Sequence, residues 1–136
     1  YINLIKELVK KNDFFFFLLC GPNEKEIADT ILNEVDKNCC ISLDDKKISE
    51  IIPLISLADI YVGNDSFGQH VASQCNIPSI IIMLDTPRAY SDYSINQFRI
   101  LPNGVNENDI SHESNFSPDT IKVEKVSEKI FSLLKL

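Results

Sequence analysis

The stretch LADIYVGNDSFGQHVASQCNIPSIIIM, residues 57–83, decides the fold that we expect for this chain. It contains a short apolar strand at 60–62, a polar turn, a predicted helix over 67–74 and a second apolar strand over 79–83. A strand, a helix and a strand in this order are typical of a parallel crossover, because two parallel strands cannot be joined by a tight turn. The stretch therefore predicts the central unit of an α/β fold.

The rest of the chain continues the same alternation. Apolar residues at helical spacing predict a helix over 1–11, and the apolar run over 14–20 predicts a strand buried on both faces. Further helices are predicted over 23–35, 49–56 and 123–134, and further strands over 40–43 and 97–101. We therefore expect a Rossmann-like α/β/α fold of three layers with a mostly parallel sheet.

Length and composition limit the classes of protein to consider. The 136 residues, 44% hydrophobic and 24% charged, are ordinary for one globular domain or for one lobe of a larger enzyme. A net charge of −7 argues against a broad nucleic-acid surface, because such a surface repels phosphates. The longest apolar run is too short to span a bilayer, so we expect no transmembrane segment.

Cysteine usage and the amino-terminal residues bear on the compartment. The four cysteines form no C-x-x-C pair, and with only two histidines they show no zinc-site spacing. No basic segment followed by an apolar segment and a cleavage site is present. We therefore expect a reduced, cytoplasmic domain, and the start at Tyr1 instead of Met suggests a piece of a larger gene product.

Three predicted strand-to-helix junctions could hold a ligand, because parallel sheets bind ligands beyond the carboxyl ends of their strands. These junctions are residues 20–24, 43–47 and 62–70, of which the third is the most polar. In that junction Ser66 and Gln69 have the spacing of a capping box. The N–H groups at the start of the following helix, with its dipole, would suit a diphosphate.

Two further residues of the third junction fit the same hypothesis. Gly68 would let a ligand approach the backbone closely, and His70, about one turn into the helix, could donate to a phosphate or sugar oxygen. Each feature also has a structural explanation, since Ser66 may act only as a cap and Asp65 only as a loop-forming residue. A hydrolase built on Ser66 and His70 is disfavoured because the Gly-x-Ser-x-Gly elbow is missing.

Residues 57–78 resemble the carboxy-terminal half of glycosyltransferase family 9, which contains the ADP-heptose:lipopolysaccharide heptosyltransferases. The family's hallmark is a strand followed by Asn-Asp-Ser/Thr-Gly-Pro-x-His-Leu-Ala, matched here by Asn-Asp-Ser at 64–66 and by His70. Leu-Cys-Gly-Pro-Asn-Glu at 19–24 resembles the family's Gly-Gly-Pro-x-Glu turn. The sequence departs from the pattern at Phe67 and Gly68, where the family has Gly and Pro.

The resemblance implies the carboxy-terminal lobe of a GT-B glycosyltransferase, which holds a nucleotide-sugar donor. The reaction would be inverting transfer from an ADP-heptose-like sugar in lipopolysaccharide or bacterial surface-glycan synthesis, with no cofactor and no tightly bound metal. In family terms Glu24 would take the ribose hydroxyls, and the turn that contains Lys46 would lie along the adenine. The substrate-binding residues would be Gly21, Glu24, Lys46, Asp65, Ser66, Gly68 and His70.

The resemblance also implies that residues 1–136 are one nucleotide-sugar-binding lobe without its amino-terminal partner. The family's acceptor lobe, first carboxy-lobe strand and phosphate loop would precede Tyr1. We therefore expect no catalytic residue and no transferase activity in this fragment alone. A glycan or lipid-linked acceptor would bind through the missing lobe, and the full-length protein would be peripheral at the inner membrane. The missing strand would leave a sheet edge open to self-association.

Two other classes of function stay open at this point. The chain could be a non-catalytic Rossmann-like module that binds a nucleotide or regulates another protein. It could also be a small hydrolase or phosphotransfer domain, which would require a reactive Ser66 or Asp65.

Overall fold

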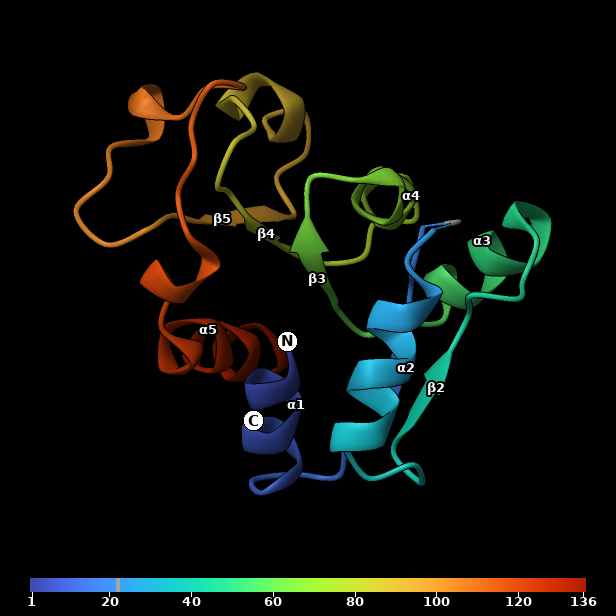
Figure 1. Ribbon diagram of the computed structural model, residues 1–136. Coiled ribbons are helices and arrows are strands. Elements are labelled where there is room, and N and C mark those ends of the chain that lie inside the picture. Colours follow the sequence, from blue (N-terminus) through green and yellow to red (C-terminus); the bar gives the residue numbers. More distant parts are fainter. Residues whose placement is uncertain (22) are drawn as a thin grey trace. The chain divides into compact units, whose positions relative to one another are not determined.

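The structure is a computed structural model that describes residues 1–21 and 23–136. Contacts between residues divide the chain into two units, Tyr1–Ile51 and Ile52–Leu136. In Figure 1 the first unit runs from blue to teal and the second from green to red.

The first unit pairs two parallel strands with helices. Its elements are α1 (Ile2–Val9), β1 (Phe16–Leu18), α2 (Lys25–Glu34), β2 (Cys40–Ser42) and the beginning of α3 (Ile48–Ser56). Strands β1 and β2 are parallel, with Phe17 opposite Ile41. Helix α1 forms where predicted and buries Leu4, Ile5 and Leu8, which its 3.6-residue period places on one stripe.

The prediction that residues 14–20 form a strand buried on both faces is wrong. Only Phe16–Leu18 are in β1, and Phe15 and Phe17 are exposed. Among the described strands β1 pairs with β2 alone. Successive side chains of a strand point to opposite faces, so this continuous apolar run leaves one set of aromatic rings uncovered. Phe15 and Phe17 pack edge to face, with ring centroids 5.7 Å apart.

The second unit holds a three-stranded parallel sheet. Its elements are β3 (Tyr61–Asn64), α4 (Phe67–Gln74), β4 (Ser79–Ile82), the 3₁₀-helix η1 (Arg88–Ser91), β5 (Gln97–Ile100), the 3₁₀-helices η2 (Glu107–Asp109) and η3 (Pro118–Thr120), and α5 (Val123–Leu134). The strand order is β3-β4-β5, and both pairs are parallel. Helices α4 and α5 flank this sheet (Figure 1). The α/β fold with a parallel sheet is thus confirmed.

Helix α4 is the crossover between β3 and β4 and has the predicted bounds. Asn76 ends it in the left-handed conformation, with φ of 61°. The N–H of Asn76 then donates to the carbonyl of Ser73 at 3.0 Å, and that of Ile77 to Ala72 at 2.9 Å. This pair of bonds is a Schellman motif, in which Asn replaces the usual glycine. It turns the chain back toward β4.

Strand β4 is the centre of the second unit. Ser79, Ile80 and Ile81 are fully buried, as expected for a strand with a parallel neighbour on each side. Ile81 and Met83 form an apolar cluster with Ile110. The partly buried residues packed against this cluster are Tyr61, Leu101, Val105 and Phe116.

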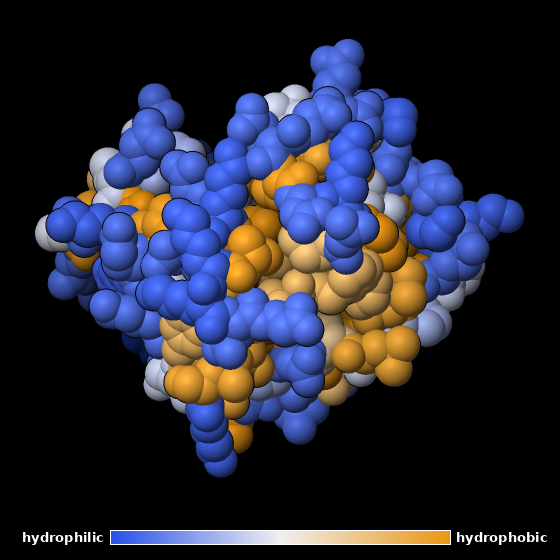
Figure 2. Space-filling view, turned by 90° about the horizontal axis from the view of Figure 1, so that it is seen from below, coloured by the Kyte–Doolittle hydropathy of each residue, from blue (hydrophilic) through white to orange (hydrophobic). Residues whose placement is uncertain are grey.

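Large apolar side chains also remain at the surface of each unit. They include Ile41 in the first unit and Leu57 and Ile95 in the second. Figure 2 draws one face of the molecule, on which orange apolar residues lie open between blue polar ones. Packing within the described residues therefore leaves apolar surface uncovered.

The described residues lack three further kinds of feature, as follows. No helix in residues 1–21 and 23–136 has both the length and the apolar character needed to cross a membrane. Within the same ranges, no three His, Cys, Asp or Glu side chains are grouped as metal ligands. The four cysteines are free, and burial raises the pKa of Cys40 to about 11, which keeps it a neutral thiol at pH 7.

Truncation of Ile81 to alanine tests the central role of β4. We expect Ile81→Ala to lower the free energy of unfolding by about 2–5 kcal/mol, because it leaves a cavity in a fully buried cluster. Urea unfolding followed by circular dichroism measures the change. Leu57→Ala, at an exposed position of the same unit, is the control and should stay within about 0.5 kcal/mol of the parent chain. Equal effects of the two substitutions would contradict this account of the core.

Candidate functional site

The junction between β3 and α4 brings several of the predicted site residues together. Asn64 ends β3, Asp65 follows, and Ser66 is the N-cap of α4 in an extended conformation. Because β3 is parallel to β4, this junction lies at the carboxyl edge of the sheet, where parallel sheets bind ligands. Asp65, Ser66, Gly68 and His70 thus occupy one turn and the first helical turn after it.

The predicted capping box between Ser66 and Gln69 does not form. Ser66 makes no side-chain cap bond, and its hydroxyl lies 3.0 Å from the hydroxyl of Tyr61. Gln69 is fully buried and donates its amide N–H to the backbone oxygen of Tyr90 at 3.3 Å. Ser66 therefore does not cap α4, although the backbone N–H of Gln69 bonds to the Tyr61 hydroxyl. The N–H groups before Gln69 are the ones that could bind an anion.

Gly63 permits the contact between Tyr61 and Ser66. A Cβ atom at Gly63 would collide with the Tyr61 hydroxyl, so only glycine leaves room for this ring to turn along the strand. The prediction that the strand ends before Gly63 is wrong, since β3 continues through Gly63 to Asn64. Gly68, expected to admit a ligand to the backbone, is buried in α4.

Asp65 is the most unusual group of the junction. Its side chain is only 12% exposed, and Oδ1 has no hydrogen-bond partner among the described residues. The same oxygen lies 3.4 Å from Nε2 of His70. Burial raises the pKa of Asp65 above its ordinary value, Asp85 adds to this shift, and His70 and His112 partly oppose it. The carboxylate is thus held in an environment that favours its protonated form.

His70 is held from both ring nitrogens. Its Nδ1 makes a hydrogen bond with the hydroxyl of Tyr93, and the two rings stack with centroids 5.7 Å apart at 18°. Its Nε2 faces Asp65. Neither contact involves Ser66, so the structure gives no support to the Ser–His hydrolase. Sequence analysis missed Tyr93, because it lies 23 positions from His70 in an irregular connection without a motif.

The junction between β1 and α2, in the first unit, contains Gly21 and Glu24. Oε2 of Glu24 accepts the N–H of Gly21 at 2.6 Å, and the N–H of Glu24 donates to the oxygen of Gly21 at 3.0 Å. A Cβ at Gly21 would stand 3.0 Å from Oε2, so a side chain there would press on the carboxylate. Pro22, part of the predicted turn, lies outside the described residues. The two hydrogen bonds with Gly21 therefore fix the orientation of the Glu24 side chain.

The turn after β2 contains Lys46, the third site residue predicted in the first unit. Its ammonium lies 2.9 Å from Oδ2 of the adjacent Asp45. Asp44 beside them accepts from Lys25 at 2.8 Å and from Ser42 at 2.6 Å. These hydrogen bonds lower the pKa of Asp44 below its ordinary value. The Lys25–Asp44 pair, which was not predicted, joins the start of α2 to the end of β2.

The comparison with family models decides which family these junctions belong to. The model described as "Glycosyltransferase family 9 (heptosyltransferase)" matches residues 1–119. The chain belongs to glycosyltransferase family 9. The resemblance to this family is thereby confirmed. No curated protein matches the sequence significantly.

A solved structure supports the fold of this family 9 chain. The chain is similar to "Structure of E. coli ADP-heptose lps heptosyltransferase II", with a TM-score of 0.80 and 21% sequence identity. The match covers 99% of this chain and 40% of that one. The chain therefore has the Rossmann-like fold of a part of that protein and spans well under half of its length.

The buried carboxyl group of Asp65 gives the family 9 chain a testable pH dependence. A raised pKa means that the folded state binds the proton more tightly than the unfolded state, so this group's contribution to stability is lost as pH rises through the folded pKa. We expect Asp65→Asn to be more stable than the parent chain at pH 7. The difference in stability should vanish below about pH 4. Urea midpoints across this pH range measure it.

Asp44→Asn is the matched control and has the opposite sign. The lowered pKa of Asp44 means that its carboxylate stabilises the fold above the ordinary Asp pKa and that this contribution is lost at lower pH. The Asn variant should therefore be less stable than the parent chain at pH 7. An Asp65→Asn variant that is destabilised at pH 7 would contradict the proposed environment of Asp65.

The Tyr93 hydroxyl should select the tautomer of His70. A hydroxyl that donates to Nδ1 leaves the proton of the neutral ring on Nε2, facing Asp65. In Tyr93→Phe we expect a mixture of tautomers, seen by NMR as a smaller difference between the two ¹⁵N shifts of His70. Tyr90→Phe is the control, because the Tyr90 ring packs against His112. Unchanged ¹⁵N shifts in Tyr93→Phe would refute this role.

Proposed function

We propose that this chain is the donor-binding part of an inverting GT-B glycosyltransferase that uses an ADP-heptose-like nucleotide sugar in lipopolysaccharide or surface-glycan synthesis. The observation that carries the proposal is the family 9 motif at the start of α4, where Asp65 lies 3.4 Å from His70 beside uncapped helix N–H groups. Such a helix start attracts phosphate oxygens through its unpaired donors and its dipole.

The diphosphate would lie at the start of α4. Backbone N–H groups of the first turn, the Ser66 hydroxyl and Nε2 of His70 offer donors to its oxygens. When the bond to the sugar breaks, negative charge grows on the leaving diphosphate. Hydrogen-bonding groups fixed toward that charge stabilise the transition state more than they stabilise the bound nucleotide sugar. This difference accelerates the reaction.

Asp65 would serve this site through His70. Its Oδ1 lies 3.4 Å from Nε2 and positions the ring beside the helix start. A fully ionised Asp65 would repel the ligand. The environment that raises its pKa reduces this repulsion, since a proton taken up on binding removes the charge.

The family resemblance assigns the nucleoside to Glu24 and Lys46. One oxygen of Glu24 holds the Gly21 turn, which leaves the other to accept from ribose hydroxyls. Lys46, held beside Asp45, would lie along the adenine. In this proposal binding needs no cofactor and no tightly bound metal, and the only anion received is the diphosphate itself.

In this proposal the complete reaction uses a second lobe. An amino-terminal lobe would bind the glycan or lipid-linked acceptor and provide the general base. The full-length protein would work in the cytoplasm, peripheral at the inner membrane, and these 136 residues alone would show no transferase turnover. The match to 40% of the similar heptosyltransferase II chain supports this division.

Titration calorimetry with ADP tests the donor site. We expect Glu24→Ala to weaken ADP binding by about tenfold or more, because it removes the carboxylate that would accept from the ribose hydroxyls. Asp65→Ala should weaken it as well, because it removes the group that positions His70. Asp59→Ala and Glu26→Ala are controls that remove the same charge from exposed residues near the opposite end of β3 and in the first turn of α2. Both controls should bind ADP like the parent chain.

Two results would count against the proposal. If both the Asp65 and the Glu24 variants bind ADP as tightly as the parent chain, the proposed donor site is wrong. Equal weakening by Asp59→Ala and Asp65→Ala would reduce the effect to net charge, with no specific contact at the start of α4.

A further inference from the structure

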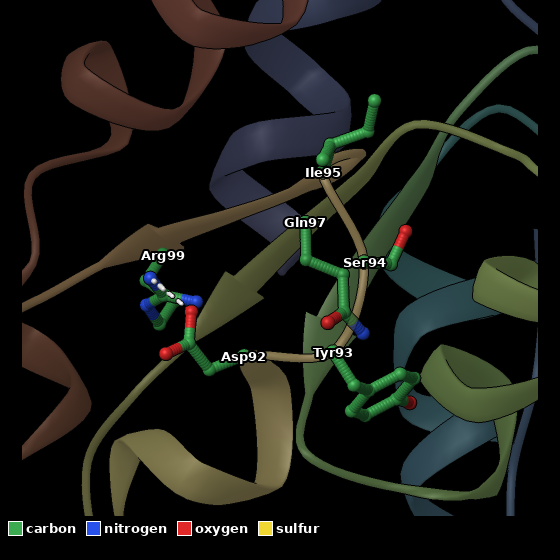
Figure 3. Close-up of a pocket in the computed structure, with 6 residues that line it drawn as sticks. All are labelled: Asp92, Tyr93, Ser94, Ile95, Gln97 and Arg99. Atoms are coloured by element: carbon green, nitrogen blue, oxygen red, sulfur yellow. Dashed lines mark hydrogen bonds and ion pairs between the residues drawn. The ribbon is translucent and has the colours of Figure 1, made fainter.

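The connection between β4 and β5 borders an open pocket outside the α4 junction. This connection is irregular apart from η1. The space beneath it has a volume of about 370 Å³. It is lined by Asp92, Tyr93, Ser94, Ile95, Gln97 and Arg99 (Figure 3).

Gln97 is the residue that marks this pocket as a binding site. It begins β5, its exposed fraction is only 7%, and its carboxamide points toward the segment that carries Asp92 and Tyr93 (Figure 3). Neither its Nε2 nor its Oε1 has a hydrogen-bond partner among the described residues. A buried amide without partners destabilises the fold unless a ligand or a water molecule completes its hydrogen bonds.

The charges around the pocket are already paired. Arg99 donates to the backbone oxygen of Ser91 at 2.7 Å, bonds to Glu107 and lies 3.4 Å from Asp92. Asp92 also accepts from Arg88 at 2.9 Å. The Gln97 amide is neutral and offers donors and an acceptor side by side. This chemistry suits an uncharged ligand that carries hydroxyl groups.

Two other walls fit the same kind of ligand. The Tyr93 ring offers an aromatic face, and Ile95, 94% exposed, adds an apolar side chain at the surface. A sugar ring has both hydroxyls for the amide and C–H groups for such walls. The hydroxyl of Tyr93 also bonds to His70, so one side chain lines the pocket and reaches the proposed diphosphate site.

We propose that this pocket binds the hydroxyl groups of a saccharide and that Gln97 recognises them. The proposal rests on the proposed function, because the glycosyltransferase reaction supplies two saccharides as possible sources. To reach Gln97, which lies at the amino end of β5, the sugar of the donor would extend from the start of α4 past Tyr93. The acceptor glycan would enter from solvent over Ile95.

The side-chain amide of Gln97 reports on the pocket directly. Its ¹⁵N–¹H signals, assigned by their loss in Gln97→Leu, are followed during titration with ADP, with ADP-heptose and with lipid-free lipopolysaccharide oligosaccharide. A shift with ADP-heptose but not with ADP supports the donor sugar as the source. A shift with the oligosaccharide alone supports the acceptor. If neither saccharide moves the Gln97 signals, the pocket holds only water and the proposal is wrong.

The same titration separates this proposal from the proposed function. If ADP leaves the backbone amides at the start of α4 unchanged, the donor site fails. The response of Gln97 to the oligosaccharide still decides the pocket in that case.

Gln97→Leu and Gln69→Leu form a matched pair of variants. Gln69 is as deeply buried and its Oε1 also lacks a partner among the described residues, but its Nε2 donates to Tyr90 and it does not line the pocket. We expect Gln97→Leu to keep or raise the urea midpoint and to reduce saccharide affinity at least fivefold. Gln69→Leu should lower the midpoint and keep the ratio between ADP-heptose and ADP affinities. A Gln97→Leu variant that loses stability, or that keeps its saccharide affinity, would overturn the proposal.

Discussion

The parallel pairing of β3 with β4 is the constraint on which the second unit depends. Two parallel neighbours cannot be joined by a tight turn, so the chain must return along the sheet, and α4 makes this return. The start of α4 then lies at the carboxyl edge of the sheet, with Asp65 before it and His70 one turn inside. The Schellman motif at Asn76 turns the chain back into β4. The site is thus a consequence of strand direction.

Two of the buried polar groups with unmet hydrogen bonds belong to the proposed binding regions. Ile81 and Met83 are buried in the apolar cluster. Asp65 and Gln97, by contrast, carry buried polar atoms without partners among the described residues. Such groups lower stability in the free protein, and a ligand that bonds to them recovers the loss. Binding and stability therefore make opposite demands on these two positions.

Local patterns predicted the elements better than their contacts. The bounds of α4 and α5 agree with the predictions, because both helices show a clear apolar period between turn residues. The apolar run over 14–20 was misleading, since a continuous run carries no information on which face is covered. The Ser66–Gln69 capping box failed because Tyr61 and Tyr90 compete for these two side chains.

The sequence by itself determined the α/β class, the order of its elements and membership of glycosyltransferase family 9, because these depend on local periodicity and on motif spacing. It also located the Asp65–His70 and Gly21–Glu24 junctions. Only the tertiary structure brought Tyr93 onto His70 and buried the Gln97 amide beneath the β4–β5 connection. These contacts join segments without a shared pattern, and their geometry depends on how an irregular connection packs against the sheet.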